Sequence, residues 1–282
     1  MHPDFSDSTL ILVGHGSTLN ADSARPTWQH ADELRRRGVF GQVVEAFWKL
    51  EPNFGAALRA ARCRRVFIVP LFISEGYFTE EVIPREMGFP LGDGPTFPRR
   101  RDDDGRTFYY CGPVGTHESM TEVLMARADE VVARHPFPHA PDRSNRSVFI
   151  AGHGTGNNDN SRKAIERQVD LIRATGRYAD VHAVFMEEAP LIASCWESAT
   201  TRNLVMVPFF ISDGLHSYED IPMMLGEPER VVRQRLAEGV PTWRNPTEKN
   251  GKRLWYSRSI GDEPHIADVI LQRAREAADV SA

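Results

Sequence analysis

The chain has little cysteine, no long apolar run and no leader-like start. Its three cysteines, Cys63, Cys111 and Cys195, lack the C-x-x-C spacing of zinc ribbons and redox motifs. We therefore expect reduced thiols in a cytoplasmic protein. No stretch approaches the roughly 20 apolar residues needed to cross a bilayer. The first residues also lack a basic segment followed by an apolar one, so we expect neither secretion nor a membrane partner.

An excess of positive charge is also missing. The 282 residues include 34 Lys and Arg against 39 Asp and Glu, a formal net charge of −5, which argues against a nucleic-acid partner. The phosphate-binding pattern G-x-x-x-x-G-K-[ST] is absent, so we do not expect a reaction driven by ATP. With 41% hydrophobic and 26% charged residues, the composition is that of a globular protein with room for two domains.

What the chain does have is an internal duplication. Three segments recur in the second half at a constant spacing of 138 residues, as the pairs His15 and His153, Pro52 and Pro190, and Pro84 and Pro222 illustrate. A constant offset across three separate segments indicates two copies of one structural unit. We therefore predict an amino-terminal domain over residues 1–138 and a carboxy-terminal domain over residues 139–282.

Short apolar runs alternate with helical stretches in both halves. The predicted strands are residues 9–13, 43–48, 66–70, 107–111, 147–151, 180–186, 204–208 and 254–257. The predicted helices are residues 28–37, 54–61, 162–174, 191–199 and 229–237. This order predicts an α/β fold of two Rossmann-like domains facing a central cleft, each a parallel sheet with helices on both faces. Residues 89–106 are predicted to form an exposed loop, and residues 135–145 the linker.

Three polar residues follow successive predicted strands of the second half. They are His153, Glu187 and His216. Ligands of open parallel sheets bind beyond the carboxyl ends of the strands, so we expect these three side chains at one rim. Two imidazoles and a carboxylate suit Fe²⁺, Co²⁺, Ni²⁺ or Zn²⁺. Taken singly, each residue has an ordinary structural explanation, so the predicted metal site depends on their coming together.

The first half differs at the same three places. His15 matches His153, but Lys49 stands where Glu187 does and Phe78 where His216 does. An ammonium group repels a divalent cation, and a phenyl ring cannot coordinate one. We therefore predict that only the carboxy-terminal rim handles metal.

These segments resemble a known family. The motifs are Val-Gly-His-Gly-Ser at residues 13–17, Ala-Gly-His-Gly-Thr at 151–155, Phe-Met-Glu-Glu-Ala-Pro at 185–190, and Gly-Leu-His-Ser-Tyr-Glu-Asp-Ile-Pro at 214–222. The chain is similar to the class II tetrapyrrole chelatases, specifically the CbiX-type sirohydrochlorin cobaltochelatases and their ferrochelatase relatives. The histidine pair lies in the carboxy-terminal half of this chain. This arrangement is more similar to that of anaerobic cobaltochelatases and protohaem ferrochelatases than to that of other long cobaltochelatases.

The resemblance implies a lyase that inserts a divalent metal into sirohydrochlorin in cobalamin biosynthesis, without ATP. Co²⁺ is the expected metal, with Fe²⁺ or Ni²⁺ as alternatives, and no other cofactor is implied. By this resemblance His153 and His216 handle the metal and the pyrrole protons, with Glu187 as the accompanying carboxylate. The remaining predicted contacts are to the tetrapyrrole, through Arg162, Lys163, Phe210 and Leu215.

Other functions stay open at this point. Insertion of Fe²⁺ would make the chain a sirohydrochlorin ferrochelatase for sirohaem. A non-catalytic metal or tetrapyrrole carrier is a second alternative, although a carrier would not need a ligand and a base together. A histidine phosphoryl-transfer enzyme is a third, but no Arg-His-Gly triplet or phosphate-binding cluster supports it.

Two acidic residues follow His216 closely. Glu219 and Asp220 are predicted to orient its imidazole.

Overall fold

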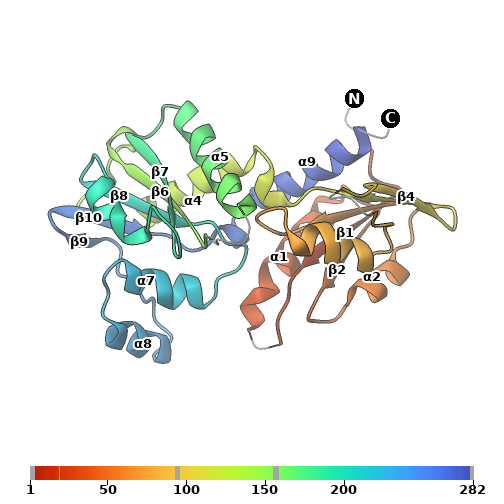
Figure 1. Ribbon diagram of the computed structural model, residues 1–282, viewed down its shortest axis with the longest axis horizontal. Coiled ribbons are helices and arrows are strands. Elements are labelled where there is room, and N and C mark those ends of the chain that lie inside the picture. The colour runs from red at the N-terminus through yellow and green to blue at the C-terminus, as the bar shows by residue number, and fades with distance from the viewer. Residues whose placement is uncertain (1–3, 19, 93–95, 155–158, 280–282) are drawn as a thin grey trace. The chain divides into compact units, whose positions relative to one another are not determined.

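A computed structural model describes residues 4–18, 20–92, 96–154 and 159–279. The chain forms two compact units, each built around a five-stranded sheet (Figure 1). The first unit combines Met1–Met120 with Pro264–Ala282, and the second is Thr121–Glu263. No helix among the described residues combines the length and apolarity needed to cross a bilayer.

The two sheets have the same strand order. In the first unit the order is β2-β1-β3-β5-β4, with β1 Ser8–Gly14, β2 Gln42–Phe47, β3 Arg65–Pro70, β4 Arg100–Asp103 and β5 Arg106–Tyr110. In the second it is β7-β6-β8-β10-β9, with β6 Ser147–Gly152, β7 Asp180–Phe185, β8 Asn203–Pro208, β9 Thr247–Lys249 and β10 Lys252–Tyr256. The predicted α/β duplication is therefore confirmed.

Helices connect the strands in both units. The first unit contains α1 Arg25–Arg37, α2 Phe54–Ala60, α3 Ile83–Glu86 and α9 Ile266–Asp279. The second contains α5 Asn160–Ala174, α6 Cys195–Ser198, α7 Ile221–Met224 and α8 Glu229–Ala237, and α4 Met120–Arg134 begins at the boundary. A π-helical turn precedes α3 and another precedes α7, at Phe78–Val82 and His216–Asp220.

The sheets are mixed rather than parallel throughout. Strand β4 pairs antiparallel with β5, and β9 pairs antiparallel with β10. Residues 89–106 therefore include a strand and are not simply the predicted exposed loop. Phe89 and Phe97 from this segment are buried in the core of the first unit. The sequence pattern missed β4 because its residues, Arg-Arg-Asp-Asp, show no apolar alternation.

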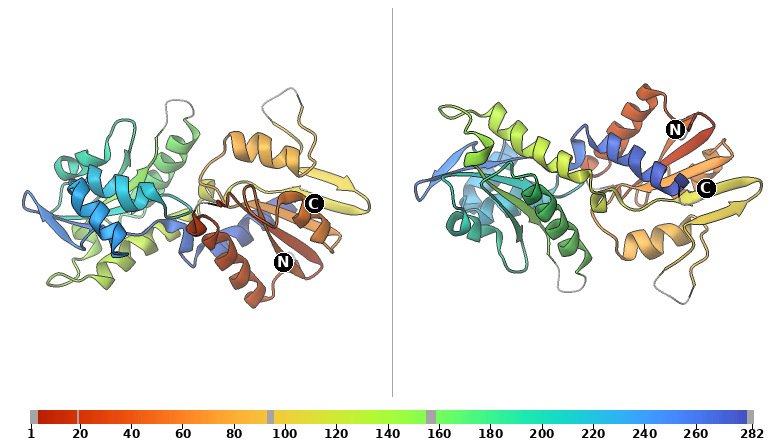
Figure 2. Two further views of the ribbon diagram at one scale, coloured as in Figure 1. Left: turned by 90° about the horizontal axis from the view of Figure 1, so that it is seen from below. Right: turned by 90° about the horizontal axis from the view of Figure 1, so that it is seen from above.

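The compact units differ from the contiguous halves, residues 1–138 and 139–282, that the repeat predicts. Helix α4 follows the first repeat, yet the Thr121 hydroxyl at its start donates a 2.8 Å hydrogen bond to Gln168 of α5. Helix α9 ends the second repeat, yet it packs on β3, β5 and α1 of the first unit (Figure 2). Each repeat thus completes its unit with the last helix of the other.

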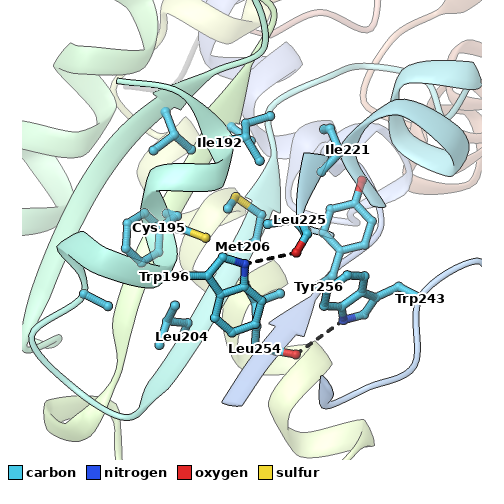
Figure 3. Packing of buried hydrophobic residues seen from close by; sticks show 14 of the residues in the cluster. Ile192, Cys195, Trp196, Leu204, Met206, Ile221, Leu225, Trp243, Leu254 and Tyr256 are labelled. Carbon is cyan, nitrogen blue, oxygen red and sulfur yellow. Dashed lines mark hydrogen bonds between the residues drawn. The ribbon is translucent and has the colours of Figure 1, made fainter. Parts of the chain in front are cut away.

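The core of the second unit supports the segment that follows β8. Trp196 and Trp243 are buried, and their indole N–H groups donate to the carbonyl oxygens of Leu225 (3.1 Å) and Leu254 (3.4 Å) (Figure 3). Because both indole donors have acceptors, the large rings can be buried without an unsatisfied polar group. Ile221, the first residue of α7, is part of this cluster and fixes the end of the π-helical turn.

Candidate functional site

The three predicted ligands of the second unit come together at the carboxyl ends of β6, β7 and β8. The His153 Nε2 atom lies 3.7 Å from the Glu187 Oε1 atom. The ring centroids of His153 and His216 are 5.0 Å apart, with the ring planes 77° from parallel. We call His153, Glu187 and His216 the carboxy-terminal rim.

Backbone hydrogen bonds hold this rim in place. The N–H groups of Met186 and Glu187 both donate to the His153 carbonyl oxygen at 3.1 Å, which ties the end of β7 to the loop after β6. Gly154 adopts φ +68°, and a Cβ atom there would lie 2.7 Å from the Glu188 Cγ atom. Only glycine satisfies both the positive φ and the close approach, which explains the Gly after His153.

The hydrogen bonds of both histidines define which ring nitrogen can act as a base. His153 Nδ1 lies 3.1 Å from the Gly154 carbonyl oxygen, and His216 Nδ1 lies 2.7 Å from the Asp220 Oδ2 atom. A carbonyl or carboxylate oxygen can only accept, so in both rings Nδ1 carries the proton. In the neutral rings the Nε2 lone pairs are then available for a metal ion or a proton.

The two imidazoles and the carboxylate lie near one another but do not form a closed coordination shell. Within the described ranges, no group of three or more His, Cys, Asp or Glu side chains is placed to hold a metal ion. The Glu187 side chain is 59% exposed and that of His216 is 51% exposed. Such an open arrangement suits a metal that is taken up and released more than one that is stored.

The four residues predicted to contact a tetrapyrrole fall into two groups: two basic side chains near acidic residues and two apolar side chains next to His216. Arg162 donates to Glu166 (2.8 Å) and to Glu188 (3.0 Å), so its guanidinium is already committed to two carboxylates. Lys163 is exposed, with its Nζ atom 4.0 Å from Asp159. The other two candidates adjoin His216: Phe210 has its ring centroid 6.3 Å from the imidazole, and Leu215 is 70% exposed.

The two acidic residues beyond His216 have different partners. Asp220 contacts the imidazole as predicted, whereas Glu219 lies 3.8 Å from Arg233 and does not contact His216. Asp220 is four residues after His216, and the π-helical turn brings both side chains to the same side. The Asp220 carboxylate therefore reaches Nδ1 of His216 from within the turn.

Three buried hydroxyl groups that sequence reasoning missed hold the His216 turn. The Tyr256 hydroxyl donates to the Ser217 carbonyl oxygen at 2.7 Å, and the side-chain oxygens of Ser217 and Ser259 are 2.7 Å apart. The first unit repeats the tyrosine contact, since Tyr110 donates to the Thr79 carbonyl oxygen at 2.6 Å. A tyrosine at the end of the last parallel strand in both halves was the available signal.

At the equivalent rim of the first unit, a phenyl ring takes the place of one imidazole and a lysine takes the place of the carboxylate. The Phe78 ring centroid lies 5.3 Å from that of His15 and 5.7 Å from that of Trp48. Lys49 is exposed at the end of β2. We call Trp48, Lys49, Tyr77 and Phe78 the amino-terminal rim.

Comparison with known proteins identifies relatives of the whole chain. The CbiX family model matches residues 9–131 and again residues 147–277. A probable sirohydrochlorin cobaltochelatase from Halobacterium salinarum is 43% identical over 278 residues, which cover 95% of this chain and 91% of that protein. The sirohydrochlorin cobaltochelatase of Methanopyrus kandleri is 27% identical over 139 residues, 46% of this chain and 96% of that protein.

Solved structures share the fold. DR2241 from Deinococcus radiodurans, described as a multi-domain protein with structural similarity to chelatases, has a TM-score of 0.76 and 29% identity. The match covers 95% of this chain and 54% of that protein, so this chain spans about half of its length. SirB from Bacillus subtilis with Fe³⁺ has a TM-score of 0.66 at 18% identity, with 97% of each chain covered.

Proposed function

The chain belongs to the CbiX family, and we propose that it inserts Co²⁺ into sirohydrochlorin in cobalamin biosynthesis. The observation that carries this proposal is the 43% identity, over 95% of the chain, to a probable sirohydrochlorin cobaltochelatase. The paired Nε2 lone pairs of His153 and His216 supply chemistry that this reaction needs. The partners are a tetrapyrrole and a divalent metal ion, both as substrates.

Insertion replaces two pyrrolic protons by one metal ion. M²⁺ loses its waters, the macrocycle releases two H⁺, and the metal becomes bound to the ring nitrogens. In our proposal His153 Nε2 and the Glu187 carboxylate receive the incoming ion, because the carboxylate offsets its charge and imidazole suits Co²⁺. The 3.7 Å between Nε2 and the Glu187 oxygen lets both groups reach one ion after a small side-chain movement.

His216 is the proposed proton acceptor. Its Nε2 lone pair takes one pyrrolic proton at a time, and Asp220 stabilises the imidazolium that forms. Since the His216 side chain is 51% exposed, the ring can pass each proton to water before accepting the next. A protonated imidazole can neither bind metal nor accept a proton, so both rings must be neutral for insertion.

One assay tests the proposal. Purified protein is mixed with metal-free sirohydrochlorin and Co²⁺, Fe²⁺ or Mg²⁺ without ATP, under anaerobic conditions, and insertion is followed by absorbance. We expect a protein-dependent change with Co²⁺, at least as fast as with Fe²⁺, and none with Mg²⁺, because nitrogen ligands discriminate against it. A faster reaction with Fe²⁺ would assign the chain to sirohaem synthesis. Binding of the macrocycle without insertion of any metal would favour a carrier.

A further inference from the structure

A largely buried carboxylate holds the loop that leads from β8 to His216. Asp213 lies three residues before His216, and its side chain is 9% exposed. Its Oδ1 atom accepts a 3.0 Å hydrogen bond from the N–H group of Ser259, in the segment after β10. The side-chain oxygen of Ser259 is in turn 2.7 Å from that of Ser217, the residue after His216. The segment after β10 is thus bonded to the chain on both sides of His216.

Ion pairs connect this carboxylate to helix α4. The Arg258 Nε atom lies 3.6 Å from the Asp213 Oδ2 atom, and the Arg258 guanidinium also donates to Asp262. Asp262 accepts in addition from Arg127 of α4, whose side chain is 5% exposed. Hydrogen bonds between charged groups are stronger than neutral ones, and in a network each member limits the movement of the next. The loop before His216 is therefore held by a chain of ion pairs that ends on α4.

The first unit has a different residue at the centre of this chain. Two residues after the end of its last parallel strand, β5, Gly112 stands where Arg258 stands after β10. Glu75, which matches Asp213 in the repeat, is exposed. Glycine has no side chain, so the ion pair made by Arg258 is specific to the unit whose turn carries His216.

We infer that Asp213 and Arg258 are positioning residues for His216, and that Arg127 anchors them to α4. The inference rests on the proposed function, in which the His216 Nε2 atom accepts a pyrrolic proton. That atom must come within hydrogen-bond distance of a pyrrole nitrogen, and a displacement of about 1 Å can lower a rate by roughly 10²-fold. The exchange of the last helices therefore lets a residue that follows the first repeat support the site of the second.

Steady-state insertion kinetics of Arg258 variants test this inference. The Arg258 side chain is 43% exposed, so Arg258→Gln should fold. We expect its kcat to fall about tenfold, with the KM for Co²⁺ and for sirohydrochlorin within about twofold. Arg258→Lys keeps the charge between the two carboxylates and should hold kcat within about threefold of the unaltered chain. A higher KM for sirohydrochlorin at unchanged kcat would make Arg258 a substrate contact and overturn the inference.

The matched control for Arg127 is Arg273 of α9 in the first unit. Its side chain is 12% exposed and donates to the Pro113 carbonyl oxygen (2.8 Å) and to Glu276 (2.7 Å). Arg127→Gln and Arg273→Gln should both lower the denaturant midpoint, but only Arg127→Gln should lower kcat, by about fivefold. Equal kcat values for the two variants would overturn the inference and leave the proposed function intact. Failure of the unaltered chain to insert any metal would overturn both.

Discussion

The two rims of this protein share a backbone and differ in chemistry. At the ends of corresponding strands, the carboxy-terminal unit presents His153, Glu187 and His216, whereas the amino-terminal unit presents His15, Lys49 and Phe78. The carbonyl oxygens of His153 and His15 each accept two main-chain hydrogen bonds of 3.1 Å, from residues at equivalent positions of the two repeats. Two substitutions on one frame thus replace a carboxylate by an ammonium group and a base by a hydrocarbon ring.

This difference shows that a conserved frame does not preserve a site. His15 and His153 both have Nδ1 against the carbonyl oxygen of the following glycine, at 2.7 and 3.1 Å. His153 has the second imidazole, His216, and the Glu187 carboxylate beside it, whereas His15 has the Phe78 ring beside it. A Gly-His-Gly motif therefore positions one imidazole, and its neighbours decide what that imidazole can do.

The largest expected effect is loss of the carboxy-terminal imidazoles. His153→Ala or His216→Ala should lower the insertion rate by about 10²- to 10⁴-fold, because each removes a metal ligand or a base. His15→Ala should leave the rate within about threefold, since this ring faces Phe78 and has no base role in our proposal. Steady-state insertion rates of the three variants provide the measurement. An equal loss of insertion rate from His15→Ala, in a variant that still folds, would show that the activity does not belong to the carboxy-terminal rim alone.

Removing the carboxylate beside His153 should have the next largest effect. Glu187→Gln keeps the side-chain volume but removes the negative charge 3.7 Å from the imidazole. We expect the KM for Co²⁺ to rise by about tenfold or more, with a smaller change in kcat. Lys49→Gln, at the matching position of the other unit, should leave the Co²⁺ dependence unchanged. If both variants shift this dependence equally, the two rims do not differ in metal handling.

A smaller effect is expected from Asp220, which orients His216. Asp220→Asn can still accept from Nδ1 but no longer stabilises the imidazolium, so kcat should fall by about tenfold. Glu219→Gln is the matched control, because Glu219 faces Arg233 and not the imidazole. The pH profile of kcat separates orientation from stability, since only Asp220→Asn should move its acidic limb. Identical profiles for both variants would remove Asp220 from the site.

The smallest effect compares the buried tyrosines that hold the two π-helical turns. Tyr256→Phe and Tyr110→Phe should each lower the free energy of unfolding by about 1–2 kcal/mol, since each leaves a buried carbonyl oxygen without its donor. Only Tyr256→Phe should also slow insertion severalfold, because its turn carries His216. Denaturant unfolding and insertion rates measure the two effects. Equal insertion rates would show that this hydrogen bond does not position His216.

Burial of the two tyrosine hydroxyl groups determines how their contribution to stability depends on pH. Burial raises the pKa of both the Tyr110 and the Tyr256 hydroxyl well above the ordinary value of 10.0. A raised pKa means that the hydrogen-bond contribution to stability is fully present below about pH 10 and is lost only as the pH rises through the folded-state value. The difference between each variant and the unaltered chain should therefore be the same throughout the neutral range.

Much of the fold could be predicted because the repeat aligns the two halves. The apolar strands β1, β3, β6 and β8 are buried along nearly their whole length, so their sequences are continuous apolar runs. The edge strands β4 and β9 were missed because they are short and charged, and only pairing with β5 and β10 makes them strands. The predicted cleft between the two halves stays a prediction.

The exchange of the last helices could not be predicted in the same way. The amphipathic pattern of α9 shows that one face is buried but not which sheet buries it. Because both repeats have the same strand order, either sheet offers a similar apolar surface. The path of the chain decides that α9 completes the first unit and α4 the second.

The sequence alone determined which residue types follow each strand, and hence that His153, Glu187 and His216 share one rim. This was possible because parallel strands place their carboxyl ends at one edge of the sheet. Only the tertiary structure decided how those groups are used. It directs Asp220 to Nδ1 of His216, leaves both Nε2 atoms available, and commits Arg162 to two carboxylates. Such pairings depend on side-chain direction and loop path, which spacing along a chain does not specify.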